Sequence, residues 1–171
     1  VLALKGIDYE YRAVNLVKDG GHQKKDEFTA LNPMGQVPVL VVGDVAISQS
    51  ARALAEVIAA GTQPIQNLSV LRKVSDKPEG QAEWANFWID RGFGAYEKMV
   101  QATAGKYSVG DEVTIADVCL VPQLYNAKRF KVDMSKFPTV TRIINALSEL
   151  DAFKAASPEV QPDCPEELRA K

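Results

Sequence analysis

Residues 32–40 read Asn-Pro-Met-Gly-Gln-Val-Pro-Val-Leu, and residues 47–50 follow as Ile-Ser-Gln-Ser. The residue before a proline is driven towards extended backbone, and an X-Pro bond can be cis at small cost. Val37 can therefore end a strand with its backbone N–H and C=O facing outward. An extended peptide could pair there.

The residues after this proline predict a hairpin that leads into a helix. We expect a strand over residues 39–42, a turn at Gly43-Asp44 and a returning strand over residues 45–48. Ser50 follows at an N-cap position, where its hydroxyl and the free N–H groups of the next turn would hold an anion, and the Gln49 amide could fix a carboxylate and an amine. The alternative is that Val-Pro is only a turn and Ser50 only a helix cap, and the pattern does not choose between the two.

Seven stretches resemble one known family, and together they run nearly from end to end. They are residues 2–11 (LALKGIDYEY), 15–21 (NLVKDGG), 30–38 (ALNPMGQVP), 63–71 (QPIQNLSVL), 105–122 (GKYSVGDEVTIADVCLVP), 126–132 (NAKRFKV) and 161–169 (QPDCPEELR). The chain resembles the glutathione transferases, and within them the zeta class of maleylacetoacetate isomerases. Residues 63–71 and 126–133 are specific to the class rather than to the superfamily.

The resemblance implies a fold of two parts, the glutathione transferase fold. Residues 1–50 would form an α/β thioredoxin-like domain, incomplete here, and residues 51–171 an all-helical domain. Two family segments have no counterpart: the first strand with its Ser-Ser-Cys run, and a helix with a linker after Gln49-Ser50. Omitted segments, a shortened form of the protein and true loss of the catalytic part all stay open as explanations.

The resemblance also implies an activity, with glutathione as cofactor. The expected reaction is cis–trans isomerisation of maleylacetoacetate to fumarylacetoacetate, in tyrosine and phenylalanine catabolism, with glutathione transfer to small α-halo acids as a side activity. Because the serine that favours the glutathione thiolate belongs to the missing run, no catalytic residue can be assigned. The alternative is a protein that binds glutathione or serves as a dimer partner without catalysis.

The family's ligand residues carry over to matching positions of this chain. The resemblance implies that glutathione is held by Gln23, Val37, Gln49, Ser50, Gln63, Asn67, Leu68 and Ser69. Simple helix packing is the alternative role for Leu68 and Ser69. Arg129 would bind a substrate carboxylate, because a guanidinium fork suits a carboxylate bidentately; a surface or structural ion pair is the alternative. The family also implies a homodimer, with residues 63–71 near its two-fold axis.

Composition agrees with a folded enzyme and excludes several other classes of protein. The 171 residues are 46% hydrophobic and carry a net charge of −2, so the chain can bury a core and has no basic excess for nucleic acid. No apolar run approaches membrane-spanning length and nothing at Val1 reads as a signal peptide, so we expect a cytoplasmic protein. Cys119 and Cys164 are expected as free thiols, and a single histidine argues against a His-based metal site.

Hydrophobic periodicity, helix-forming composition and the positions of glycine and proline predict the remaining elements. We expect the last turn of a helix at residues 1–5, a strand over 9–16, and helices over 24–31, 52–60 and 139–150, with Pro64 starting or kinking a further helix up to 74. Thr114 and Asp117 should form a capping box. Trp84, Phe87, Trp88, Ala95, Tyr96 and Met99 recur at helical spacing and are expected in the core. An irregular tail is expected from residue 157.

Overall fold

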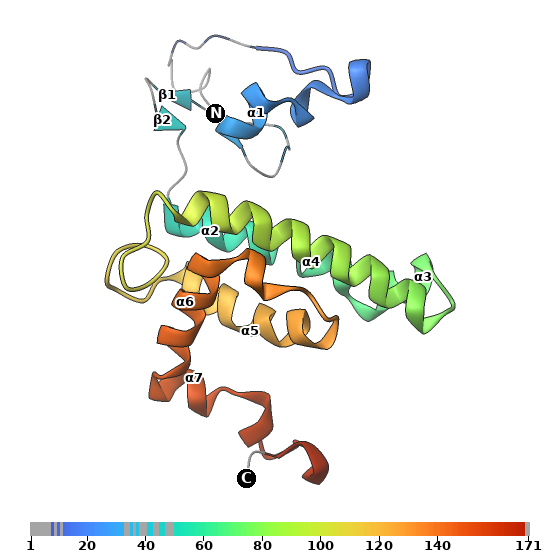
Figure 1. Cartoon of the computed structure of the whole chain (residues 1–171), viewed down its shortest axis with the longest axis vertical. Helices are drawn as coiled ribbons and strands as arrows, with labels where there is room; N and C mark the ends of the chain where they lie inside the picture. Colours follow the sequence, from blue (N-terminus) through green and yellow to red (C-terminus); the bar gives the residue numbers. More distant parts are fainter. Residues whose placement is uncertain are drawn as a thin grey trace. The chain divides into compact units, whose positions relative to one another are not determined.

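The computed structural model describes residues 8, 10, 12–32, 35, 37, 41–42, 45–46 and 50–169 (Figure 1). The chain divides into two compact units, Val1–Ile47 and Ser48–Lys171. Each unit has its own secondary structure. The sequence boundary proposed after residue 50 stays a prediction.

The first unit contains one short α-helix and one hairpin. Helix α1 spans Asp26–Leu31 and follows two 3₁₀ turns, Lys18–Gly20 and His22–Lys24. It ends at Asn32, whose φ of −140° and ψ of 99° are extended, as a residue that precedes proline requires. The predicted helix over 24–31 is therefore confirmed in its main part.

The hairpin prediction is confirmed for the strand residues that the structure describes. Strands β1 (Val41–Val42) and β2 (Val45–Ala46) pair antiparallel, with Val42 opposite Val45. Two residues therefore connect the strands, as the Gly-Asp turn predicts. Residues 39–40 and 47–48 lie outside the described residues, as do residues 1–5.

The strand predicted over 9–16 is wrong for the residues that can be followed there. Residues 10 and 12–15 have no regular structure and Leu16 lies in a bend. An alternating pattern becomes a strand only when a neighbouring strand supplies hydrogen bonds. Within the described part of the first unit, strand pairing is confined to the hairpin.

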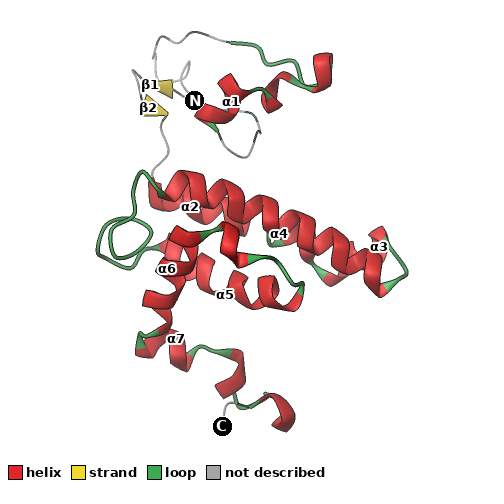
Figure 2. Ribbon diagram, in the orientation of Figure 1, coloured by secondary structure: helices red, strands yellow, loops and turns green. Residues whose placement is uncertain are grey.

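The regular elements described in the second unit are helices (Figure 2). Its α-helices are α2 (Ser50–Ala59), α3 (Leu68–Val74), α4 (Pro78–Val100), α5 (Ile115–Arg129), α6 (Pro138–Ser148) and α7 (Asp151–Ala155), with 3₁₀ turns at Pro64–Gln66, Met134–Lys136, Pro158–Val160 and Glu166–Leu168. A loop with an isolated bridge between Ala104 and Gly110 joins α4 to α5. The helices predicted over 52–60 and 139–150 are confirmed as α2 and α6. Pro64 opens a separate 3₁₀ turn ahead of α3.

The core of the second unit lies where α2, α4, α5 and α6 meet. Helix α4 buries Ala85, Ile89, Phe93, Tyr96 and Val100, which follow one another at spacings of three and four. Such spacing places all five on one face of the helix. The four helices thereby share one hydrophobic core.

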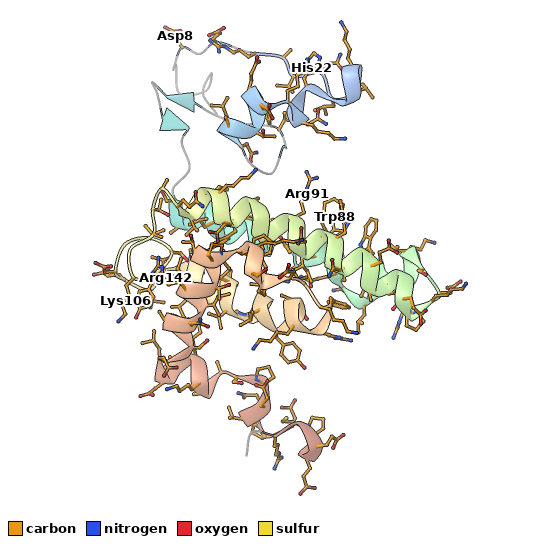
Figure 3. The ribbon with its side chains drawn as sticks, in the orientation of Figure 1. Asp8, His22, Trp88, Arg91, Lys106 and Arg142 are labelled. Carbon is orange, nitrogen blue, oxygen red and sulfur yellow. The ribbon has the colours of Figure 1, made fainter. Side chains whose placement is uncertain are left out.

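One core prediction for α4 is wrong in part, namely the one that places Trp84, Phe87, Trp88, Ala95, Tyr96 and Met99 in the core. Ala95 and Tyr96 are buried, but Phe87 is 55% exposed, and Trp84, Trp88 and Met99 are half-buried. The two tryptophans and Phe87 occupy a face beside the buried one and pack edge to face, with ring centroids 5.4 and 5.7 Å apart. Arg91 lies one turn on, its guanidinium carbon 5.6 Å from the Trp88 ring centroid (Figure 3).

The start of α5 is fixed by the capping box that the sequence predicts. Asp117 Oδ2 accepts the Thr114 N–H at 2.8 Å and the Thr114 hydroxyl at 3.0 Å. The other oxygen, Oδ1, accepts the Ser108 N–H at 2.9 Å, and the Ser108 hydroxyl pairs with the Tyr96 hydroxyl at 2.8 Å. The fully buried Asp117 therefore ties the loop between α4 and α5 to both helices.

Two further sequence expectations can be compared with the described residues. Cys119 and Cys164 are free, as predicted. Across the residues that the structure describes, none of the helices is both long and apolar enough to cross a membrane.

Candidate functional site

In the first unit, Gln23 is held beside a glycine that no other residue could replace. Gly21 has a φ of +98°, and a Cβ there would lie 2.6 Å from the Gln23 side chain and 2.8 Å from the Leu16 carbonyl oxygen. Gln23 Nε2 donates to that carbonyl at 3.4 Å. Its Oε1 is buried and accepts no hydrogen bond from the described residues. A buried acceptor of this kind fits a donor supplied by a ligand.

The predicted ligand pair at residues 49 and 50 is only partly described. Gln49 lies outside the described residues. Ser50 is half-exposed and is the first residue of α2, so the helix begins at Ser50 and not after it. Val37, in the first unit, lies in a bend and is 41% exposed.

The segment between α2 and α3, which carries four predicted ligand residues, is anchored first by Thr62. This side chain is fully buried, and its hydroxyl donates to the Val57 carbonyl at 2.7 Å. Helix α4 approaches it at Gly92, where a Cβ would lie 2.2 Å from Thr62 Oγ1. Glycine is therefore required at position 92 for α4 to reach the turn.

A pair of buried glutamines anchors the same segment to α5. Gln66 Nε2 donates to Gln123 Oε1 at 2.7 Å, and Gln123 Nε2 returns a bond to Gln66 Oε1 at 3.3 Å. On the α4 side, the Trp84 indole N–H donates to the Ile65 carbonyl at 3.1 Å. These hydrogen bonds hold in place the backbone of the segment between α2 and α3, which carries the predicted ligand residues.

The four predicted residues of this segment differ in their surroundings. The Asn67 side chain caps α3 and accepts the Ser69 N–H and the Ser69 hydroxyl, each at 3.1 Å. Leu68 is 54% exposed, and Gln63 is half-exposed with no side-chain hydrogen bond to the described residues. The amide group of Asn67, the side chain of Gln63 and the apolar surface of Leu68 are thus available on a rigid support.

Arg129 lies at the last residue of α5 and is exposed. Its guanidinium carbon is 5.3 Å from the Phe130 ring centroid. Asn86 of α4 donates to the carbonyls of Phe130 and Lys131 at 2.9 and 3.1 Å, which fixes the backbone beyond the arginine. Within the described residues, Arg129 forms no ion pair, so the structural role weighed from the sequence gains no support there.

The sequence did not identify the residues that support these positions, namely Thr62, Gln66, Gly92 and Gln123. Gln66 lies inside the class-specific stretch 63–71, which was a signal of its importance. Its partner is 57 residues away, and no local pattern reveals such a pairing. No group of three or more potential metal-ligating residues occurs in the described parts of the chain.

Comparison with known proteins places the chain in a family. Residues 1–60 match the family model for the glutathione S-transferase N-terminal domain, and residues 65–155 match that for the C-terminal domain. The chain belongs to the glutathione transferases. The predicted fold, a thioredoxin-like part followed by a helical part, is confirmed.

Similar proteins of known class place this glutathione transferase in the zeta class, among enzymes. Maleylacetoacetate isomerase of Rattus norvegicus is 48% identical over 194 residues, covering 98% of this chain and 89% of that protein. A solved zeta-class maleyl pyruvate isomerase is 36% identical, with a TM-score of 0.66, and the match covers 96% of this chain and 92% of that one.

A third relative carries ligands. The maleylacetoacetate isomerase of Anaeromyxobacter dehalogenans, solved with dicarboxyethyl glutathione and citrate in its active site, is 41% identical. Its TM-score is 0.65, and the match covers 96% of this transferase and 89% of that chain.

In the alignment to the rat enzyme, some positions of the rat sequence have no counterpart in this chain. The alignment extends over 194 residues, whereas this transferase has 171, so at least 23 aligned positions hold no residue of it. Segments present in the relative are therefore missing from the sequence of this chain.

Proposed function

We propose that this transferase binds glutathione and uses it in the cis–trans isomerisation of a maleyl dicarboxylate, with maleylacetoacetate as substrate and fumarylacetoacetate as product. The observation that carries the proposal is the 48% identity to a maleylacetoacetate isomerase over 98% of the chain. The reaction belongs to tyrosine and phenylalanine catabolism. Glutathione conjugation of small α-halo acids is proposed as a side activity.

The reaction needs a nucleophile that adds reversibly to the double bond, and it needs side chains that bind the carboxylates of the substrate. Bound glutathione supplies a thiol that adds to the activated double bond, permits rotation about the resulting single bond and leaves again by elimination. The dicarboxyethyl glutathione held by the Anaeromyxobacter relative supports this type of chemistry, because such a group is what thiol addition to a butenedioate leaves on sulfur. This chain's part is to hold the tripeptide and orient the dicarboxylate.

We assign the glutathione contacts to the residues predicted from the family. Val37 would pair with the cysteinyl backbone through its own backbone groups, and Gln49 and Ser50 would hold the γ-glutamyl end. The buried Gln23 Oε1, which lacks a donor from the described residues, supports a ligand contact there. Gln63, Asn67, Leu68 and Ser69 would close the site.

The wider setting is proposed on the same basis. The glutathione-binding domain would comprise residues 1–50, the helical domain residues 51–171, and the gap in the alignment would fall after Ser50. We also propose that the protein is cytoplasmic and a homodimer whose axis passes near residues 63–71.

Titration of the purified protein with glutathione tests the binding assignment. Gln49→Ala removes hydrogen bonds to a charged end of the ligand and should weaken binding by roughly 1.5–3 kcal/mol. Gln101→Ala, at an exposed position just beyond α4, is the matched control and should bind like the parent protein. An unchanged titration in Gln49→Ala would refute the assignment.

The second candidate function is glutathione binding without isomerisation. It applies if no hydroxyl group of the protein donates a hydrogen bond to the glutathione thiolate. Without a hydrogen bond to its thiolate, a bound thiol would keep a pKa of about 8.5, and little nucleophile would exist at neutral pH. Glutathione binding with no turnover above the rate in free glutathione would select this candidate.

A further inference from the structure

Helix α5 ends at Arg129 in a turn that two backbone hydrogen bonds close. The Lys131 N–H donates to the Lys128 carbonyl at 3.1 Å, and the Val132 N–H donates to the Ala127 carbonyl at 2.9 Å. Ala127 and Val132 are both buried. These two bonds, with an apolar residue at each end of the second, form a Schellman motif, the turn that ends many helices. The position of Arg129, the last residue of the helix, therefore depends on this turn.

Lys131 gives the turn an unfavourable backbone conformation. Its φ is +57°, and every other residue with a positive φ in the described part of the chain is a glycine. Left-handed backbone brings the Cβ of an L-residue too close to the following carbonyl oxygen, a clash that glycine avoids. Glycine is the usual residue at this position of a Schellman motif. With a lysine there, the turn needs a further interaction to hold its shape.

Asn86 of α4 supplies that interaction. Its half-buried side chain donates through Nδ2 to the Phe130 carbonyl at 2.9 Å and to the Lys131 carbonyl at 3.1 Å. The amide group carries a hydrogen for each acceptor. These carbonyls belong to the two peptide groups that flank the Cα of Lys131, and the φ and ψ of that residue set the angle between those groups. One side chain of the second unit therefore holds the left-handed conformation in place.

We propose that Asn86 is a positioning residue for Arg129 in dicarboxylate binding. The inference rests on the proposed function, which assigns the Arg129 guanidinium to a substrate carboxylate. A bidentate bond requires the guanidinium and the carboxylate to meet in one plane, so it is sensitive to where the helix ends. If the turn relaxes for part of the time, only the remaining fraction of molecules binds the dicarboxylate at full strength. The glutathione contacts are assigned to other residues and should not change.

Titration of the full chain with succinate in the presence of glutathione tests the role, because this saturated dicarboxylate has no double bond to react. Asn86→Ala removes both hydrogen bonds and should weaken succinate binding about fivefold while glutathione affinity stays unchanged. Adding Lys131→Gly should restore succinate binding to within about twofold of the parent, because glycine adopts the left-handed conformation without the clash. In an Arg129→Lys background, which has already lost the bidentate bond, Asn86→Ala should have no further effect.

Gln161→Ala is the matched control for the loss of a side-chain amide. The half-buried Gln161 also donates through Nε2 to two backbone carbonyls, those of Ala155 at 2.9 Å and Ser157 at 3.0 Å, so its loss should leave succinate binding unchanged. Circular dichroism confirms that each variant is folded.

The outcomes separate this inference from the function on which it rests. Succinate binding that is weakened in Arg129→Lys but unchanged in Asn86→Ala would overturn the inference alone. A loss in Asn86→Ala that Lys131→Gly does not restore, or that recurs in the Arg129→Lys background, would overturn it as well. A parent protein that does not bind succinate, or an Arg129→Lys variant that binds it like the parent, would overturn the proposed role of Arg129 and this inference with it.

Discussion

Tyr96 is a buried residue whose ionisation makes the stability of the helical unit depend on pH. Its hydroxyl pairs with Ser108 inside the helical unit, and burial raises its pKa above the ordinary value of 10.0. Above about pH 10 the unfolded chain releases this proton while the folded chain keeps it, so stability falls as pH rises.

Tyr96→Phe removes that proton and should change the pH dependence of unfolding. At about pH 7 the variant loses one buried hydrogen bond, at a cost of about 1 kcal/mol. Above about pH 10 the free energy of unfolding of the parent falls by up to about 1.4 kcal/mol per pH unit because of Tyr96. The variant has no such loss. Urea unfolding at several pH values measures the difference in free energy of unfolding between the parent and the variant. This difference should shrink as pH rises and then change sign. A difference that stays constant with pH would contradict the buried assignment.

Arg129 is the residue proposed to distinguish dicarboxylate from glutathione binding. Lysine keeps the charge but cannot form a bidentate fork, so Arg129→Lys should raise KM for a maleyl dicarboxylate about tenfold and leave glutathione affinity unchanged. Steady-state kinetics and a glutathione titration separate the two effects. Equal losses for both ligands, or for neither, would count against the role. Arg142→Lys, on α6, provides a control for the loss of a guanidinium.

At the residue scale, sequence was informative where both partners are close in the chain. The Thr114 and Asp117 capping box has its two partners three residues apart, and the pattern predicted it correctly. The bond from Ser108 N–H to Asp117 crosses a loop, and the Gln66 and Gln123 pair crosses 57 residues. Such pairings are decided by packing, which a local pattern does not contain.

At the scale of elements, the glutamine pair is expected to hold the segment 62–69 against α5. Gln123→Leu leaves the Gln66 amide buried without its partner and should destabilise the fold by about 2 kcal/mol. Replacing both glutamines by leucine removes the unsatisfied group and should recover most of that loss. Urea unfolding of the two single variants and the double variant measures the coupling. If the losses in unfolding free energy of the two single variants simply add in the double variant, the two glutamines are not coupled.

The sequence predicted helices better than strands. For the helices, it predicted the end residues better than the buried faces. Helix α6 was located by its amphipathic pattern, and helix α2 by helix-forming composition that ends at Gly61. In α4 the predicted residues came from two faces, because Tyr96 lies on the buried line with Ile89 whereas Phe87 is exposed. Tryptophan and phenylalanine at helical spacing identify a helix but do not identify its buried side.

At the scale of the whole molecule, the two-part fold was predictable only through resemblance. Composition shows only that the chain can bury a core, whereas the seven stretches between residues 2 and 169 identified the family that the domain matches then confirmed. The mass of the intact protein shows whether the segments absent from this sequence are present in the molecule.

Turnover of maleylacetoacetate by the protein of verified mass tests whether this chain catalyses glutathione-dependent isomerisation. Fumarylacetoacetate should form well above the rate in free glutathione, its formation should depend on added glutathione, and it should be slower in Arg129→Lys when the dicarboxylate is limiting. Turnover no faster than that in free glutathione, from protein that still binds glutathione, would contradict the proposed isomerisation.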